Sequence, residues 1–274
     1  MCTLIVSFQQ HQSAPLIVAA NRDELRGRPA TPPRRWEGEP FVAPKDEQAG
    51  GSWLGLTTGG MFVGVTNRFG SERFPDRESR GTLVIEALRA PSARTLRASL
   101  EGLSPTRFNT FHLLYADAKA AFVTWSDGSQ IHHDTLKPGL HVVTERSLGG
   151  DDHGRTKLIT SAWPEGMPTV ESLEQLLARP GVCVDLPEWN YGTRSSLVLF
   201  VTSKLADWRW FWAEGRPDQV PFVEKPELIA SLSPLAQGEG DRSALRELAK
   251  HVLKNATVLV SSAIVEGAIE VSVE

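Results

Sequence analysis

Several features that mark other classes of protein are scarce in this chain of 274 residues. Its two cysteines, Cys2 and Cys183, are too few for a disulfide framework, so we expect a reduced, cytoplasmic setting. No apolar run approaches the ~20 residues of a membrane-spanning helix, and the N-terminal segment lacks the basic start of a signal peptide. A formal net charge of −4 favours no nucleic-acid partner. The oligomeric state stays open.

Metal-binding spacings are also missing. The chain has no His-Glu-x-x-His and no Cys-x-x-Cys, and the adjacent His132 and His133 would face opposite ways on a strand. We therefore expect no metal site and no required cofactor. One axial ligand is enough for haem, so haem held as cargo by Cys2 or by a histidine such as His112 stays open.

Short apolar runs separated by turns predict mostly antiparallel strands, with helices between the later ones. The expected strands are 2–8, 16–20, 52–57, 61–66, 111–115, 121–125, 140–144, 195–201 and 208–212. The expected helices are 82–89, 93–100, 156–163, 170–177 and 243–253. This order of elements indicates an α+β or layered α/β fold.

Two proline-rich stretches interrupt the pattern. We expect a loop over 29–44 and a linker or irregular insertion over 217–240. The last segment, 257–273, alternates β-branched and smaller residues as a strand would.

Cys2 is the most informative residue, because removal of Met1 would make it the first residue of the chain. It would then carry a thiol and a free α-amine, whose pKa is ~8 when exposed. Such an amine can act as the base for a nucleophile beside it. The alternative is a small buried residue on an edge strand, which is common for free cysteine.

Polar residues lie at the ends of three predicted strands. Asn21-Arg22-Asp23-Glu24 and Asn67-Arg68 follow apolar runs abruptly, and the stretch from Tyr191 to Ser196 opens another strand. Three such strand ends can converge on one ligand cleft. Alternation along the strand would place Asn21 and Asp23 on one face, with Arg22 and Glu24 on the other. The alternative for the first motif is a turn closed by an Asn or Asp side chain, with a surface ion pair.

These motifs resemble the NRDE family, also called the Transport and Golgi Organization 2 family. The resemblance covers roughly residues 1–213 and rests on several motifs in the right order. The matching stretches are Met1–Ile5, Leu16–Glu24, Arg28-Pro29, Gly50–Gly55, Thr66-Asn67, Gly81, Cys183 and Tyr191–Ser196.

The resemblance implies a single four-layer αββα sandwich of the N-terminal-nucleophile hydrolase type, mostly antiparallel. The domain would span 1–274, with 217–274 as its divergent C-terminal part. It also implies catalytic roles for Cys2 as nucleophile, Asp23 as the group that orients the amine, and Asn67 with Asn21 as oxyanion donors. The expected substrate-binding residues are Arg22, Arg68, Thr193 and Arg194.

Two positions depart from the amidases related to this family. An arginine of their Arg-Asn-x-Asp motif falls on Ala20, and a later asparagine falls on Glu145. A carboxylate cannot donate to an oxyanion unless it is protonated. The first hypothesis is therefore a hydrolase or acyl transferase acting on an amide or thioester acyl bond. The alternative is a protein that binds and carries haem, an acyl lipid or acyl-CoA in the same cleft.

Overall fold

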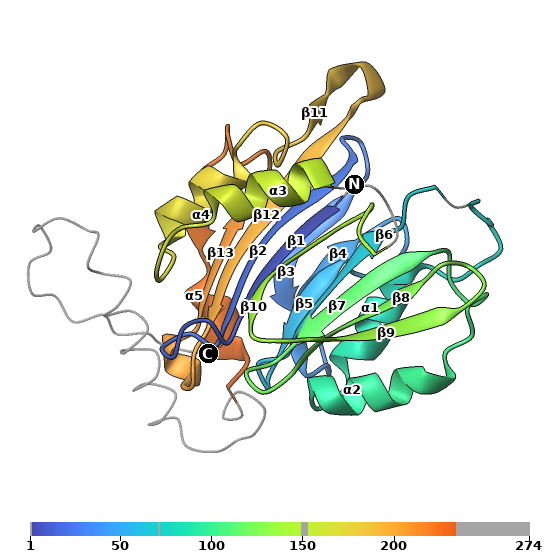
Figure 1. Ribbon diagram of the computed structural model, residues 1–274, viewed down its shortest axis with the longest axis horizontal. Helices are drawn as coiled ribbons and strands as arrows, with labels where there is room; N and C mark the ends of the chain where they lie inside the picture. Colours follow the sequence, from blue (N-terminus) through green and yellow to red (C-terminus); the bar gives the residue numbers. More distant parts are fainter. Residues whose placement is uncertain (1, 71, 149–152, 234–274) are drawn as a thin grey trace, which may run out of the picture.

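Two antiparallel β-sheets of seven strands each pack face to face (Figure 1). The computed structural model describes residues 2–70, 72–148 and 153–233. The first sheet has the order β10 (Gly139–Thr144), β1 (Cys2–Phe8), β2 (Leu16–Leu25), β12 (Tyr191–Val201), β13 (Arg209–Ala213) and β14 (Val223–Glu224), with β11 (Asp185–Leu186) paired to β12. The second has the order β3 (Ala30–Arg35), β4 (Phe41–Asp46), β5 (Leu54–Thr57), β6 (Phe62–Asn67), β7 (Phe111–Ala116), β8 (Ala121–Ser126) and β9 (Ile131–Leu136).

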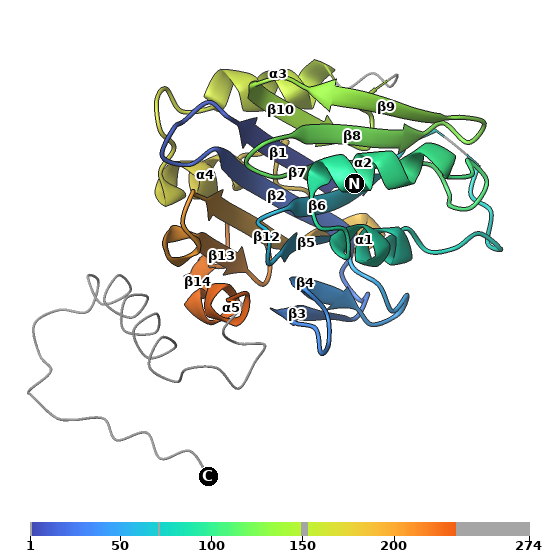
Figure 2. The ribbon, with the colours of Figure 1, turned by 90° about the horizontal axis from the view of Figure 1, so that it is seen from below.

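Helices cover the outer faces of both sheets. The helices α3 (His153–Ala162) and α4 (Val170–Leu177) lie on the first sheet, and α1 (Arg80–Leu88) and α2 (Ala93–Ser99) lie on the second (Figures 1 and 2). A short helix, α5 (Pro226–Ser231), contacts β13 and β3. The four-layer αββα sandwich expected from the sequence is therefore confirmed. In the part of the chain that the structure describes, no helix is long and apolar enough to cross a membrane.

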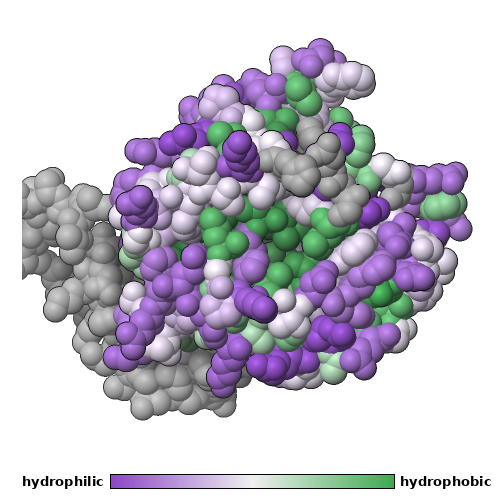
Figure 3. All heavy atoms as spheres, in the orientation of Figure 1, coloured by the Kyte–Doolittle hydropathy of each residue, from purple (hydrophilic) through white to green (hydrophobic). Residues whose placement is uncertain are grey.

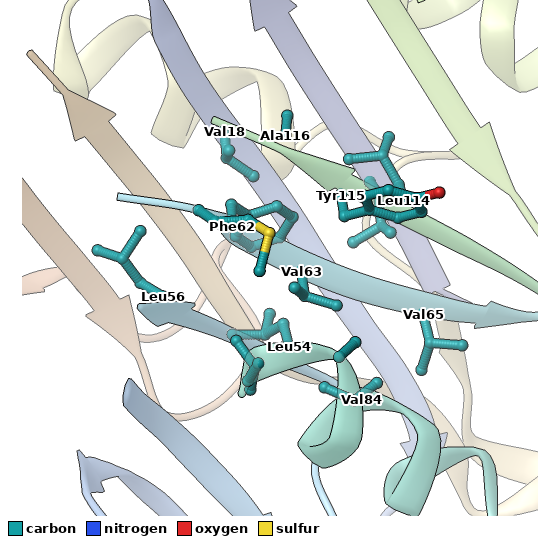
Figure 4. Close-up of a cluster of buried hydrophobic side chains, with 14 of the residues drawn as sticks. Val18, Leu54, Leu56, Phe62, Val63, Val65, Val84, Leu114, Tyr115 and Ala116 are labelled. Atoms are coloured by element: carbon teal, nitrogen blue, oxygen red, sulfur yellow. The ribbon is translucent and has the colours of Figure 1, made fainter. Parts of the chain in front are cut away.

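The core follows from the two-residue period of the strands. In β1, Leu4 and Val6 belong to the core between the sheets, whereas Ile5 packs in the layer beneath α3 and α4. Figure 4 shows Val18 of β2 close to Phe62 of β6 between the two sheets. On the outer face of the second sheet, Val84 of α1 closes the same cluster.

The loop predicted over 29–44 is wrong, because this stretch contains β3 and much of β4. Prolines are tolerated at sheet edges and bulges. β3 is an edge strand, and its register with β4 shifts between Thr31 and Arg34, at the position of Pro32 and Pro33. The strand β9 was not expected because its sequence, Ile-His-His-Asp-Thr-Leu, is polar and half exposed.

The insertion predicted over 217–240 is also wrong for its described part. This segment forms β14 and α5, and Leu228, Ile229 and Leu232 are buried in the core. The predicted helix over 243–253 and the strand over 257–273 lie outside the described residues.

Polar side chains dominate the face seen in Figure 3, with an apolar hollow near its middle. Figure 1 shows β1 and β10 in that region. Leu140 and Val142 of β10 are partly buried and pack against the cluster beneath α3 and α4.

Two glycines allow the loop before β5 to cross the first turn of α1. A Cβ on Gly51 would lie 2.3 Å from the backbone carbon of Gly81, and one on Gly81 would lie 3.1 Å from the nitrogen of Ser52. The Ser52 N–H donates to the Gly81 carbonyl at 3.3 Å. This crossing fixes where α1 begins relative to β5.

We expect Gly51→Ala to destabilise the protein by about 3 kcal/mol, at the upper end for overpacking, because rigid backbone must move. Gly102→Ala is the control, since a Cβ there meets nothing within 4 Å. Urea unfolding of both variants measures the difference. Equal midpoints would show that the crossing is not a constraint.

Candidate active site

A cleft of about 400 Å³ opens at the end of the sandwich where β1 begins and β2 and β6 end. Cys2, Asp23 and Asn67 all line this cleft, although they come from three different strands. The strand register produces this grouping, because Cys2 pairs with Arg22 across β1 and β2, and Asp23 pairs with Thr193 across β2 and β12.

Cys2 is partly exposed in the cleft and forms no disulfide. Burial raises the pKa of its thiol above the ordinary value, and the negative charge of Asp23 acts in the same direction. The positive charge of Arg22 and a backbone hydrogen bond from Asp23 oppose the rise in pKa. At neutral pH the side chain is therefore a thiol, which needs a base before it can act as a nucleophile.

Asp23 is a buried carboxyl group beside this thiol, with 3 % of its surface exposed. Burial raises its pKa from 3.8 to about 7, and the hydroxyl of Thr193 opposes the rise by donating to Oδ1 at 2.6 Å. Thr193 is itself fixed, because its Oγ1 accepts from the Val184 N–H at 2.9 Å. Thr193 therefore orients Asp23, in contrast to the substrate-binding role expected from the sequence.

Arg22 lines the same cleft but is already engaged. Its guanidinium carbon lies 4.0 Å above the ring of Trp53, and Nη2 lies 3.4 Å from Oδ2 of Asp46. Burial lowers its pKa. Arg28 shares the same carboxylate at 2.7 Å. Arg28 also lies 3.9 Å from Oε2 of Glu24, so two arginines meet two carboxylates on this wall beside Cys2.

Asn67 ends β6 and is exposed at the mouth of the cleft. A side-chain amide carries two N–H donors, which suit a developing oxyanion. Asn67 also borders an adjoining hollow of about 360 Å³.

Asn21 does not line the cleft, although it shares a face of β2 with Asp23 as predicted, since each side chain bonds its cross-strand partner on β12. Its Nδ2 donates to the carbonyls of Leu177 and Val182 at 3.0 and 3.1 Å, and its Oδ1 accepts from Ser196. Both N–H groups are therefore used beneath α4, so neither is left to donate to an oxyanion in the cleft. The register of β12 shifts between Thr193 and Ser195 beside this stretch, and such bulges change the local twist.

Two of the expected substrate-binding arginines also lie elsewhere. Arg194 donates to the carbonyls of Leu25, Arg26 and Arg28, so it holds the turn after β2. Arg68 borders the adjoining hollow, where its guanidinium lies 5.4 Å from the ring centre of Trp125.

Ala20 and Glu145 are the two positions that depart from the expected amidase motifs, and each has well-defined contacts. Ala20 is buried in the core. Glu145 borders the adjoining hollow, and its Oε2 lies 3.4 Å from Nη1 of Arg155. An ion-paired carboxylate offers no hydrogen bond to an oxyanion.

Three cleft residues were not singled out from the sequence. Arg73, Arg77 and Arg80 follow β6 and line the same cleft as Arg22. Arg73 and Arg77 lie on an aperiodic stretch, and Arg80 begins α1 two residues before the helix expected from the sequence. A usable signal was present, because four arginines fall within residues 68–80 of an acidic chain.

No histidine lines the cleft or the adjoining hollow in the described chain. His112 is buried against Thr66, at 3.0 Å, and burial lowers its pKa to about 4. His132 stacks on Trp125, and His133 bonds Thr124. Within residues 2–70, 72–148 and 153–233, no three His, Cys, Asp or Glu side chains group as metal ligands.

The family model for Transport and Golgi organisation 2 matches residues 1–180, so the chain belongs to this family. It is 30 % identical to the Transport and Golgi organization protein 2 homolog of Bos taurus over 251 residues, which covers 73 % of this chain and 88 % of that protein. It is also 30 % identical to the Mus musculus homolog, over 43 % of this chain and 45 % of that protein. The chain thus matches less than half the length of the mouse protein.

Two solved structures are similar at low identity. One is the Caenorhabditis elegans ortholog of N-acylethanolamine-hydrolyzing acid amidase, with 15 % identity, a TM-score of 0.48, and coverage of 72 % of this chain and 92 % of that one. The other is the C2A mutant of the conjugated bile acid hydrolase from Clostridium perfringens, with 9 % identity, a TM-score of 0.46, and coverage of 83 % and 93 %.

The raised pKa of Asp23 makes the free energy of unfolding depend on pH. Folding raises this pKa, so the stability contributed by the protonated group is complete below pH 3.8 and is lost as pH rises to about 7. We expect Asp23→Asn to gain stability relative to the wild type between pH 4 and pH 8, by up to about 4 kcal/mol. Urea unfolding at several pH values measures this gain.

Asp127→Asn is the control, because the stability contributed by Asp127 depends on pH in the opposite direction. The hydrogen bond with His132 lowers the pKa of Asp127, so its stabilisation is present at neutral pH and lost as pH falls. An Asp23→Asn curve parallel to the wild type would show that Asp23 keeps an ordinary pKa in the folded protein.

Proposed function

We propose that this protein is an N-terminal cysteine hydrolase or acyl transferase that acts on an amide or thioester acyl bond. The observation that carries the proposal is that Cys2, Asp23 and Asn67 line one cleft. A thiol, a carboxyl group and an exposed amide donor supply the parts that acyl transfer requires.

The reaction begins after removal of Met1, when the α-amine of Cys2 becomes the base. The amine takes the thiol proton, and Sγ attacks the acyl carbon to form a tetrahedral oxyanion. The oxyanion collapses, the bond to the leaving amine or thiol breaks, and the ammonium returns the proton to that leaving group. Water, or an acceptor in the case of transfer, then cleaves the thioester on Cys2 and releases the acyl group.

Asp23 and Asn67 support these steps in different ways. An ionised Asp23 holds the ammonium form of the amine and so favours proton transfer from the thiol. Because burial places its pKa at about 7, this contribution increases as pH rises through 7. The Asn67 amide donates to the oxyanion, which is a transition-state interaction.

The surroundings of Glu145 favour a second candidate function. Where the related amidases have a second oxyanion asparagine, this chain has a carboxylate paired with Arg155. A cleft with fewer oxyanion donors suits a protein that binds and carries an acyl lipid, acyl-CoA or haem. Of the two modes of haem ligation, the cleft favours the Cys2 thiolate, since no histidine lines its described walls.

We expect Cys2→Ala to abolish multiple turnover of acyl substrates while retaining ligand affinity, because the thiol acts mainly in the transition state. A panel of N-acyl amino acids, acyl-CoA thioesters and haem covers both candidate functions. Cys183→Ala is the matched control and should keep full activity. Intact mass of the purified protein reports whether Met1 has been removed.

Each alternative outcome has a clear meaning. Retention of Met1 would contradict the proposed base. Binding of an acyl ligand without release of acid, equal in the wild type and Cys2→Ala, would favour the carrier. A haem spectrum lost in Cys2→Ala would favour haem carriage through the thiolate.

We expect Asn67→Asp to lower kcat by about 10²–10³-fold with little change in KM, because the carboxylate has the same shape but cannot donate. Steady-state kinetics measure both constants. An increase in KM alone would assign Asn67 to substrate binding instead.

A further inference from the structure

The two walls of the cleft differ in how their positive charges are balanced. On the first wall, Arg22 and Arg28 share the carboxylate of Asp46. On the second wall, Arg73, Arg77 and Arg80 form no ion pair with any described residue. We call these three residues the arginine wall.

The contacts of the arginine wall leave most of its donors unused. Arg80 donates once, to the Thr110 carbonyl at 3.0 Å, and Arg77 donates once, to the Phe108 carbonyl at 3.3 Å. Arg73 is exposed and makes no hydrogen bond within the described chain. A guanidinium carries five N–H donors. Several donors of the arginine wall therefore remain available to a ligand.

The carboxylates of the cleft are held by other partners. Glu78 makes a two-point contact with Arg107, at 2.8 and 3.0 Å. Glu24 accepts from the Leu25 N–H at 2.8 Å and lies 3.9 Å from Arg28. Neither carboxylate forms an ion pair with the arginine wall.

Electrostatics agree with this geometry. Burial and the positive charge of Arg73 together lower the pKa of Arg80 to about 10. The negative charge of Glu24 acts in the opposite direction. An anion between the two arginines would relieve their repulsion.

We propose that the arginine wall binds an anionic oxygen group of the ligand, a carboxylate or a phosphate, and so directs an acidic acyl compound towards Cys2. Planar guanidinium groups match both kinds of anion through paired hydrogen bonds. This inference rests on the proposed function, because it names the substrate class of the same cleft. The anion subsite itself needs no turnover and is tested without it.

The test compares alkylation of Cys2 by iodoacetate, which is anionic, and by iodoacetamide, which is neutral, at pH 8.5. Peptide mapping separates Cys2 from Cys183, which serves as the internal reference. We expect Arg73→Gln to lower the iodoacetate-to-iodoacetamide rate ratio at Cys2 about threefold, from Coulomb attraction across about 7 Å in water. Arg73→Gln/Arg80→Gln should lower it about ninefold, and the exposed Arg94→Gln should leave it unchanged.

Two added anions distinguish whether the arginine wall prefers a phosphate or a carboxylate group of the ligand. Inorganic phosphate or hexanoate is added before iodoacetamide, with KCl at equal ionic strength as the control. Protection by phosphate alone indicates a phosphoryl ligand, protection by hexanoate alone indicates a carboxylate, and protection by both supports the shared anion chemistry. Protection that is equal in Arg73→Gln/Arg80→Gln, or absent for both anions, would overturn the proposal.

A rate ratio that is unchanged in both arginine variants would also overturn it. If neither reagent reaches Cys2, the melting temperature reports anion binding instead. A ligand that binds the folded state raises the melting temperature. A rise with phosphate or hexanoate beyond KCl, lost in the double variant, supports the subsite, and no such rise overturns it. If only the hydrolase proposal fails, Cys2 will still react preferentially with iodoacetate in an arginine-dependent way, but no acyl substrate will be turned over.

Discussion

The candidate site depends on a carboxyl group that folding buries next to a thiol. Asp23 lies at the end of β2, where the Thr193 hydroxyl holds it and where burial raises its pKa to about 7. At about 1.4 kcal/mol per pKa unit, ionising such a group costs roughly 4 kcal/mol of stability at alkaline pH. In the proposed reaction, the ionised form of Asp23 would hold the positive amine of Cys2.

The fold was largely predictable from the sequence because its strands alternate regularly. Leu4 and Val6 face one side of β1 while Ile5 faces the other, which is the pattern of a sheet covered on both faces. The exceptions have local causes. Pro32 and Pro33 concealed an edge strand, and the polar β9 lacks the alternation that identifies strands.

The site was predictable only where strand ends determine it. Cys2, Asp23 and Asn67 meet because β1, β2 and β6 begin or end at the same edge of the sandwich. The use of both Asn21 N–H groups beneath α4 was not predictable, because their acceptors, the carbonyls of Leu177 and Val182, are far away in the sequence. The arginine wall depends on the tertiary path of 68–80 and on where α1 begins, which the Gly51 crossing fixes.

In the proposed function the cleft divides its roles, with Asp23 and Cys2 performing the chemistry and the arginine wall selecting the ligand. The most direct measurement is to trap an acyl group on the protein. The wild type is mixed briefly with an acyl thioester, quenched in acid, digested and analysed by mass spectrometry. The account predicts the acyl mass on the peptide that begins at Cys2, with slower accumulation in Asp23→Asn. An acyl mass on Cys183, or acyl ligand bound without any covalent adduct, would contradict it.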